Sequence, residues 1–139
     1  MYIDKNLLFA DTLTTTTSGA ATDYLDSTAA SIKLGDGYSH PLFWVVKTEA
    51  AFAGGAACTA TFQLQTANDA SFTDGCVTLA ATDAFLTAAL TINTVMARIR
   101  VPLGIKRYTR VYMVVGGTGV FTTVSYSSFL TPEADNNLP

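Results

Sequence analysis

The sequence predicts an all-β chain, folded as an antiparallel sandwich or barrel with short or no helices. Three observations support this prediction: apolar and polar residues alternate with a period of two, glycine-rich turns recur at short intervals, and no segment has a convincing amphipathic helical pattern. A period of two is that of a strand with one buried face. Many short strands separated by turns are typical of sandwiches and barrels. At 139 residues, we expect one β domain spanning residues 1–139.

The N-terminal third of the sequence predicts an extended segment and one buried strand. Residues 1–20 include a threonine run at 14–17, and we expect them to form an extended N-terminal arm or an edge strand. Residues 42–47 form a continuous apolar run, which predicts a strand covered on both faces. Gly54 and Gly55 mark the turn after that strand.

The clearest alternation lies in residues 58–66, where every second residue is apolar. The same pattern predicts strands at 96–101 and 107–115, each with a polar face that carries arginines. Pro102 ends the first of these two strands, and their exposed residues could form one patch if the two strands pair antiparallel around 102–107.

The remaining chain is rich in β-branched and aromatic residues. A glycine-rich turn at 116–119 predicts a hairpin between 107–115 and a long β-prone segment at 120–130. Residues 83–92 are expected to form a short helix at most. Residues 131–139 are acidic and end in proline, which predicts a mobile tail.

Charge is scarce and unevenly distributed. Charged residues make up 14% of the chain, below the usual quarter, and the net charge is -3. A surface this neutral suggests that part of it is covered by a partner or by copies of the chain. Five of the eight basic residues lie within 98–110, which contains no acid. The acidic isoelectric point, about 4.8, argues against nucleic-acid binding.

This basic segment is the candidate binding site. Arginine and tyrosine are enriched where interfaces carry most of their binding energy. We therefore predict a protein interface formed by Arg98, Arg100, Arg107, Tyr108, Arg110 and Tyr112. The alternative is that these arginines pair with the chain's own acids.

Residues with catalytic or metal-binding chemistry are sparse. His40 is the only histidine and has no nucleophile-elbow motif to serve. Cys58 and Cys76 are too far apart for the usual zinc-ligand spacing and are expected to be free thiols. We expect no catalytic residues, no metal and no cofactor, and therefore no enzyme.

The order of several sequence blocks resembles the capsid cement (decoration) proteins of tailed bacteriophages, of the type first associated with a short-tailed Bordetella phage. The blocks that carry this resemblance are Leu-Leu-Phe-Ala-Asp at 7–11, Leu-Gly-Asp-Gly at 34–37, Pro-Leu-Phe at 41–43, Phe-Gln-Leu-Gln-Thr at 62–66, Asp-Ala-Ser-Phe at 69–72, Val-Pro-Leu-Gly at 101–104 and Arg-Tyr-Thr-Arg-Val-Tyr at 107–112. The chain departs from the family pattern in the Ala/Thr-rich residues 50–60 and the Ala-rich residues 80–90.

The resemblance implies a jelly-roll-like sandwich on the outside of an icosahedral capsid, where it cements neighbouring major capsid subunits without catalysis. Its expected partners are the major capsid protein and further copies of itself, with a dimer favoured over a trimer. The N-terminal residues lack a signal-peptide pattern, and no apolar run reaches the length of a membrane span. We therefore expect assembly in the host cytoplasm, with no membrane partner.

A second function remains open, because jelly rolls also form lectins. On that alternative the chain is a carbohydrate-binding, adhesin-like sandwich on a virion surface. Trp44, Tyr38 and Tyr108 are the aromatic residues that would stack on sugar rings. Burial of Trp44 within its apolar run would count against it.

Overall fold

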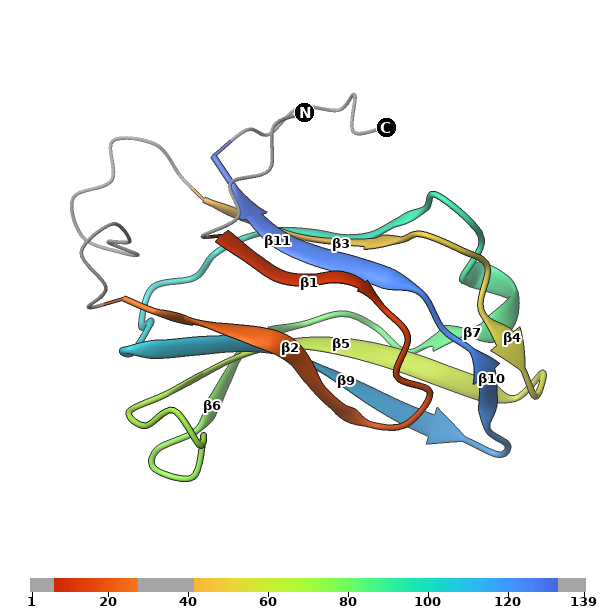
Figure 1. The fold of residues 1–139 in the computed structure, drawn as a ribbon, viewed down its shortest axis with the longest axis horizontal. Helices are drawn as coiled ribbons and strands as arrows, with labels where there is room; N and C mark the ends of the chain where they lie inside the picture. The colour runs from red at the N-terminus through yellow and green to blue at the C-terminus, as the bar shows by residue number, and fades with distance from the viewer. Residues whose placement is uncertain (1–6, 28–41, 133–139) are drawn as a thin grey trace.

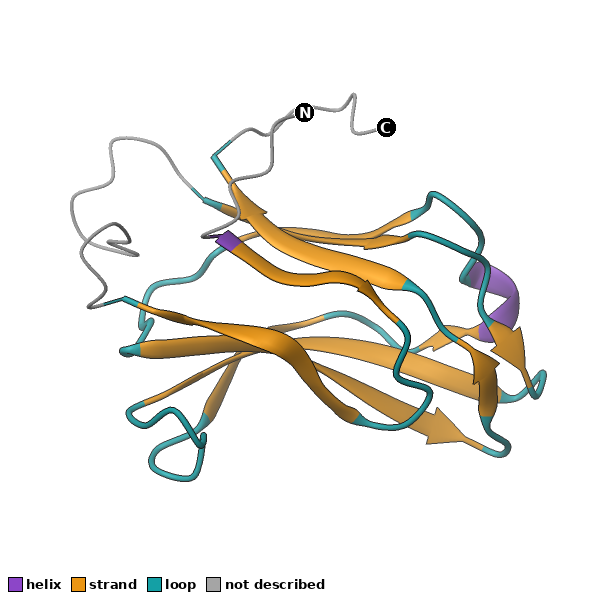
Figure 2. Cartoon of the chain, in the orientation of Figure 1, coloured by secondary structure: helices purple, strands orange, loops and turns teal. Residues whose placement is uncertain are grey.

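The computed structural model describes residues 7–27 and 42–132. These residues form two antiparallel sheets stacked as a sandwich (Figures 1 and 2). The first sheet has the order β1 (Leu8–Leu13), β11 (Tyr126–Thr131), β3 (Phe43–Thr48) and β8 (Val95–Arg100). The second has the order β2 (Gly19–Asp26), β9 (Tyr108–Gly117), β5 (Cys58–Ala67) and β6 (Val77–Ala81).

Three short strands and one turn of 3-10 helix complete the described fold. β4 (Ala53–Gly54) pairs with β10 (Phe121–Thr123), and β7 (Phe85–Leu86) pairs with β5. The 3-10 turn spans Thr87–Ala89. All of them lie at the same end of the sandwich, the right-hand end in Figure 1.

The strand order is that of a jelly roll. If the three short strands are set aside and the other eight are counted in chain order, the sheets read 1-8-3-6 and 2-7-4-5. Each sheet thus alternates early and late strands, which is the arrangement that two Greek keys produce. The predicted all-β antiparallel sandwich, jelly-roll-like with short helices at most, is confirmed.

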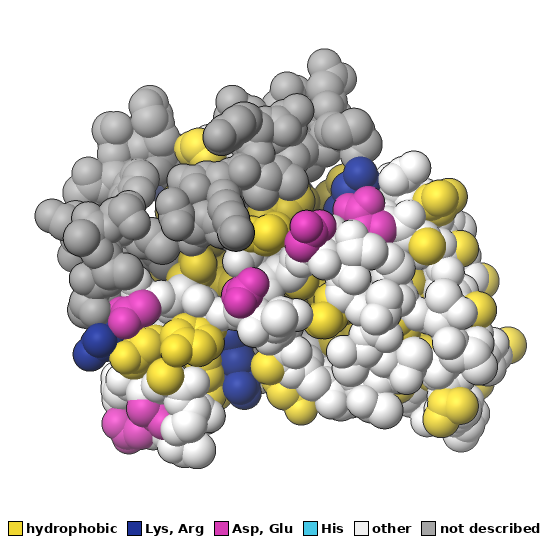
Figure 3. Space-filling model, viewed as in Figure 1, with side chains coloured by type: hydrophobic (Ala, Val, Ile, Leu, Met, Phe, Trp, Pro, Cys, Tyr) yellow, Lys and Arg dark blue, Asp and Glu magenta, His cyan; other side chains and the backbone are white. Residues whose placement is uncertain are grey.

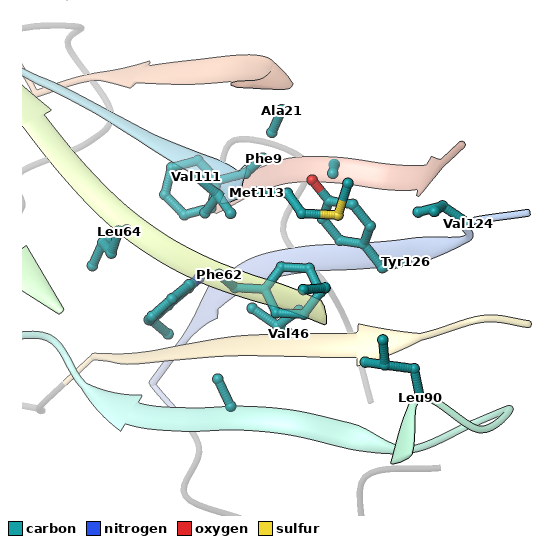
Figure 4. Close-up of a cluster of buried hydrophobic side chains, with 14 of the residues drawn as sticks. Phe9, Ala21, Val46, Phe62, Leu64, Leu90, Val111, Met113, Val124 and Tyr126 are labelled. Carbon is teal, nitrogen blue, oxygen red and sulfur yellow. The ribbon is translucent and has the colours of Figure 1, made fainter. Parts of the chain in front are cut away.

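The core lies between the sheets and follows the period-two pattern. In β5 the burial alternates along the strand, with Phe62 and Leu64 buried and Gln63 and Gln65 half-buried on the other face. Figure 4 shows these apolar side chains facing Val46 and Tyr126 of the first sheet. The rings of Phe62 and Tyr126 meet edge to face, with centroids 5.0 Å apart, an arrangement that aromatic pairs favour.

β3 is buried on both faces, as its continuous apolar run predicts. Trp44, Val45 and Val46 are fully buried. The indole Nε1 of Trp44 donates a hydrogen bond of 3.0 Å to Ser128 Oγ, and that hydroxyl donates to the backbone oxygen of Val45 at 3.1 Å. The one polar atom of the Trp44 side chain is thus satisfied, which lets the large ring lie in the core.

Two strand pairings suggested by the sequence are wrong. β8 pairs with β3 in the first sheet and β9 pairs with β2 and β5 in the second, so residues 101–107 cross between the sheets. The glycine-rich turn at 116–119 leads into β10, which pairs with β4, and the chain then enters the first sheet at β11. Periodicity identifies a strand and its buried face but carries no information on its partner. In this jelly roll most consecutive strands lie in opposite sheets, and β5 and β6 are the exception among the eight long strands described.

The long segments at 83–92 and 120–130 also differ from prediction. The first contains only β7 and the 3-10 turn, and the second is divided into β10 and β11 at Val124 and Ser125. Residues 8–13, within the stretch expected as an arm or edge strand, form β1 at the edge of the first sheet. His40, Tyr38 and residues 133–139 lie outside the described residues.

Candidate interaction surface

The six residues of the predicted interface lie on two different sheets. Arg98 pairs with Val45 on the outer face of the first sheet, and Arg100 is exposed at the end of β8. The other four residues belong to β9 or directly precede it, in the second sheet. Because the two strands do not pair, the predicted single patch is divided between opposite faces of the sandwich.

The four residues from the second sheet contact four residues that the predicted interface did not include: Tyr24, Asp26, Gln65 and Phe72. In the pairing register, Tyr24 of β2 lies opposite Arg110, which lies opposite Gln65 of β5. Phe72, from the loop before β6, covers the same face and is buried there. We call this set the arginine–aromatic face: Tyr24, Asp26, Gln65, Phe72, Arg107, Tyr108, Arg110 and Tyr112.

Arg107 is already paired within the chain. Its Nε and one terminal nitrogen each donate a hydrogen bond of 3.1 Å to the carboxylate of Asp26, so the contact is bidentate. These hydrogen bonds raise the pKa of Arg107 above its ordinary value. The Arg107 side chain remains about half exposed, and an ion pair so open to water adds little to stability. The prediction that the arginines pair internally therefore holds for Arg107.

Arg110 has a different environment. Its Nε donates a hydrogen bond of 2.9 Å to Gln65 Oε1, and Gln65 in turn donates to Gln63 Oε1 at 3.0 Å. The guanidinium carbon lies 4.2 Å from the ring centroid of Phe72 and 5.2 Å from that of Tyr112. Within the described residues no carboxylate forms an ion pair with Arg110. A neutral amide and two aromatic rings thus orient this cation, and no carboxylate of the described residues pairs with it.

The loop at 68–76 places Phe72 on this face. One carboxylate, that of Asp69, accepts hydrogen bonds from the Thr73 and Asp74 backbone nitrogens at 3.0 and 2.8 Å and from the Thr73 hydroxyl at 2.8 Å. It also accepts one from the Ser71 hydroxyl. These bonds, led by that from Ser71, hold the pKa of Asp69 well below its ordinary value.

Aromatic contacts extend the face toward β2. The Tyr24 ring is about half exposed and meets Tyr108 edge to face, with centroids 5.7 Å apart. It also approaches Phe72, at 6.3 Å. Sequence reasoning had a signal for Gln65, which lies on the polar side of a clean alternation. It had none for Tyr24 or Phe72, because only the fold brings their segments to β9.

At the opposite end of the sandwich, three segments carry exposed apolar residues and no charged side chain, and Glu49 borders them through a backbone hydrogen bond to Ser125. The segments 50–57, 84–95 and 116–125, which we call the uncharged end, contain no Asp, Glu, Lys or Arg. Their exposed apolar side chains are Leu86, Ile92, Val95 and Val120. Figure 3 shows this end, at the right, as apolar and neutral on the face drawn.

Hydrogen bonds hold these segments together. The Thr87 hydroxyl donates to the backbone oxygen of Gly55 at 2.8 Å, and the Gly55 backbone nitrogen donates to the backbone oxygen of Val120 at 3.2 Å. The β4 and β10 backbones approach so closely that a Cβ at Gly54 would lie 2.6 Å from the Val120 oxygen. The segments that carry Leu86 and Val120 are therefore held together by hydrogen bonds and close backbone packing, and do not form independent loops.

The described residues hold neither a cluster of metal ligands nor a membrane-spanning helix. Among residues 7–27 and 42–132, no three His, Cys, Asp or Glu side chains gather where they would hold a metal ion. In the same residues no helix is long and apolar enough to cross a membrane. Cys58 is buried, as its place on the apolar face of β5 predicts, and Cys76 is exposed.

These features define a jelly-roll sandwich with an arginine–aromatic face near one end and an uncharged surface at the other. The chain belongs to the Bbp16 family, whose model matches residues 9–130. The family name is associated with a Bordetella phage, which points to a phage virion protein. No curated protein matches the chain.

Proposed function

We propose that this chain is a non-catalytic structural protein that binds the outer face of an icosahedral phage capsid and cements neighbouring major capsid subunits. Its place would then be the capsid exterior, reached by assembly in the host cytoplasm. Membership of a phage-associated family supports this proposal, as does the jelly-roll fold. A protein that binds only the assembled shell stabilises it by linkage, with no need for a cofactor or an energy source.

The observation that carries the proposal is the state of Arg110. A guanidinium oriented by Gln65 and two rings, without a carboxylate among the described residues, has the composition of an interface anchor. Arg98 and Arg100 lie on the other sheet and would need a separate contact. We therefore assign docking to the arginine–aromatic face.

The test is addition of the purified protein to capsid shells that lack it. The proposal expects saturable binding at micromolar concentration or tighter, with a fixed ratio to the major capsid protein. It also expects a higher melting temperature of the shell once binding is saturated. Absence of binding, or binding without any gain in shell stability, would remove the cement function.

We further propose that the protein acts as a homo-oligomer whose copies meet at the uncharged end, with a dimer favoured. An apolar surface without charge can meet its own copy without like-charge repulsion, and a twofold contact uses the same patch on both copies. Light scattering on a sizing column tests this. A dimer or trimer at micromolar concentration supports it, whereas a monomer both in solution and on the shell would end it.

The carbohydrate-binding alternative loses its main residue. Trp44 is fully buried, with its indole nitrogen bonded to Ser128. It is therefore not available to stack on a sugar ring. Tyr108 packs against Tyr24 and lies beneath the guanidinium of Arg107, at 4.9 Å. No observation on the described residues favours this second function.

A further inference from the structure

We propose that Arg110 binds a carboxylate side chain of the major capsid protein, through the terminal nitrogens of its guanidinium. This inference rests on the proposed capsid-binding function and names the chemical group that the arginine–aromatic face recognises. It also separates the two arginines of that face, since Arg107 already has its carboxylate in Asp26.

The contacts of Arg110 determine which of its atoms are available. Nε is occupied by Gln65 at 2.9 Å, and the guanidinium lies over the rings of Phe72 and Tyr112. The two terminal nitrogens make no hydrogen bond to any described residue. They form the planar pair of donors that binds the two oxygens of a carboxylate in parallel.

The surroundings favour an acidic protein side chain over a more highly charged ligand. The groups that touch Arg110 are neutral: one amide and two aromatic rings. The neighbouring cation, Arg107, is bonded to Asp26, and the whole chain is acidic, with a net charge of -3. A single uncompensated positive charge in such a field matches a single carboxylate, whereas nucleic acid would need a broad basic surface.

The orientation of Arg110 is set before binding. Gln65 is itself held by Gln63, and Phe72 lies in a loop that Asp69 closes with hydrogen bonds to Ser71, Thr73 and Asp74. An arginine already fixed in its bound position loses less side-chain entropy on docking. A bidentate contact of this kind contributes strongly at the centre of an interface.

The experiment measures coupling between Arg110 and the shell's carboxylates. Shells lacking the protein are used either untreated or after carbodiimide coupling to a neutral amine, which converts exposed carboxylates to amides. Both are titrated with the wild type, with Arg110→Gln and with Arg110→Lys. Arg107→Gln is the matched control, because it removes the same charge from the neighbouring arginine that is already paired.

On untreated shells we expect Arg110→Gln to weaken binding by about 10- to 100-fold, the loss typical of a charge-assisted bidentate contact. Arg110→Lys should restore only part of that loss, because an ammonium lacks the planar pair of donors. Arg107→Gln should change binding less than about threefold. Amidation of the shell should weaken binding of the wild type by a larger factor than it weakens binding of Arg110→Gln. The ratio of these two factors should equal the loss of binding that Arg110→Gln causes on untreated shells.

The outcomes separate the two proposals. If the wild type binds untreated shells and Arg110→Gln binds equally well, the Arg110 inference is wrong and the cement function stands. The same holds if amidation weakens both proteins by the same factor, because Arg110 would then have no carboxylate partner on the shell. If the wild type does not bind untreated shells, both proposals fail.

Discussion

The two ends of the β5–β9 strand pair differ in surface chemistry although they share one continuous core. At one end Ala67 pairs with Tyr108, beside the arginine–aromatic face, and at the other Cys58 pairs with Gly117, within reach of the uncharged end. Along most of this length the inward residues of both strands are apolar and buried, whereas Thr66 and Thr109 are buried polar residues beside the arginine–aromatic face. The jelly roll therefore fixes the interior, while its outer face and connecting loops change character from one end to the other.

This difference suggests two kinds of contact for one small domain. A face with an oriented arginine gives geometric selectivity, because only an acidic group in the right place can bind it. A neutral apolar end gives contact area with little directional demand.

The largest expected effect is at the uncharged end. Val120→Asp would place an unpaired charge in the proposed contact between copies, which should weaken self-association by more than a hundredfold. Leu103→Asp is the matched control, since Leu103 is exposed outside this end. Light scattering would compare the masses of the two variants. Equal masses for the two variants would show that the copies meet elsewhere.

Charge reversal should distinguish the roles of Arg107 and Arg110 in the arginine–aromatic face. Arg110→Glu should weaken shell binding by about a hundredfold, because it repels the proposed carboxylate as well as losing its hydrogen bonds. Arg107→Glu should have a smaller effect, since Arg107 is paired with Asp26. Arg107→Glu should melt within a few degrees of the wild type, because Arg107 is exposed and exposed charges contribute little to stability. Arg110→Glu should also stay folded, because Arg110 is only half-buried. Unfolding of Arg110→Glu would instead make Arg110 an internal structural partner.

Asp69→Ala tests whether the loop at 68–76 orients the face. Loss of its four hydrogen-bonding contacts should free Phe72 from Arg110 and weaken shell binding by about tenfold. Self-association should not change. If shell binding were unaffected, the position of Phe72 would be irrelevant to docking.

The pH dependence of the same loop has a definite sign. Because the folded pKa of Asp69 lies below its ordinary value of 3.8, its contribution to stability is fully present above that pH. It is lost as the pH falls from about 4 toward the lowered folded value. Thermal melts should therefore show the wild type and Asp69→Ala converging in stability below pH 4. A gap that stays constant with pH would contradict this.

The smallest effect is expected in the core, where neither surface should be disturbed. The hydroxyl of Tyr126 is buried and has no hydrogen-bond partner among the described residues, and burial raises the pKa of that group above its ordinary value. Tyr126→Phe removes the unpaired group, so we expect a gain of about 1 kcal/mol, or a rise in Tm of roughly 3 °C. A lower Tm would mean that the hydroxyl has a stabilising role.

Prediction from sequence succeeded for features that the residue pattern of a single strand determines. The alternation in β5 and the apolar run in β3 gave both the strands and their buried faces. It failed where two segments had to be matched, as for Arg98 and Arg110, which the crossing at 101–107 places on different sheets. Tyr24 and Phe72 were missed for the same reason, because each reaches Arg110 only through the pairing of distant strands.

The central claim is that the arginine–aromatic face docks on the capsid. Electron cryomicroscopy of shells saturated with this protein would test it most directly, by showing which surface of the jelly roll meets the shell. The account predicts Arg110 at the contact, against a carboxylate of a major capsid subunit, with the uncharged end turned toward another copy. Density that shows Arg110 facing solvent while another face of the domain meets the shell would contradict it.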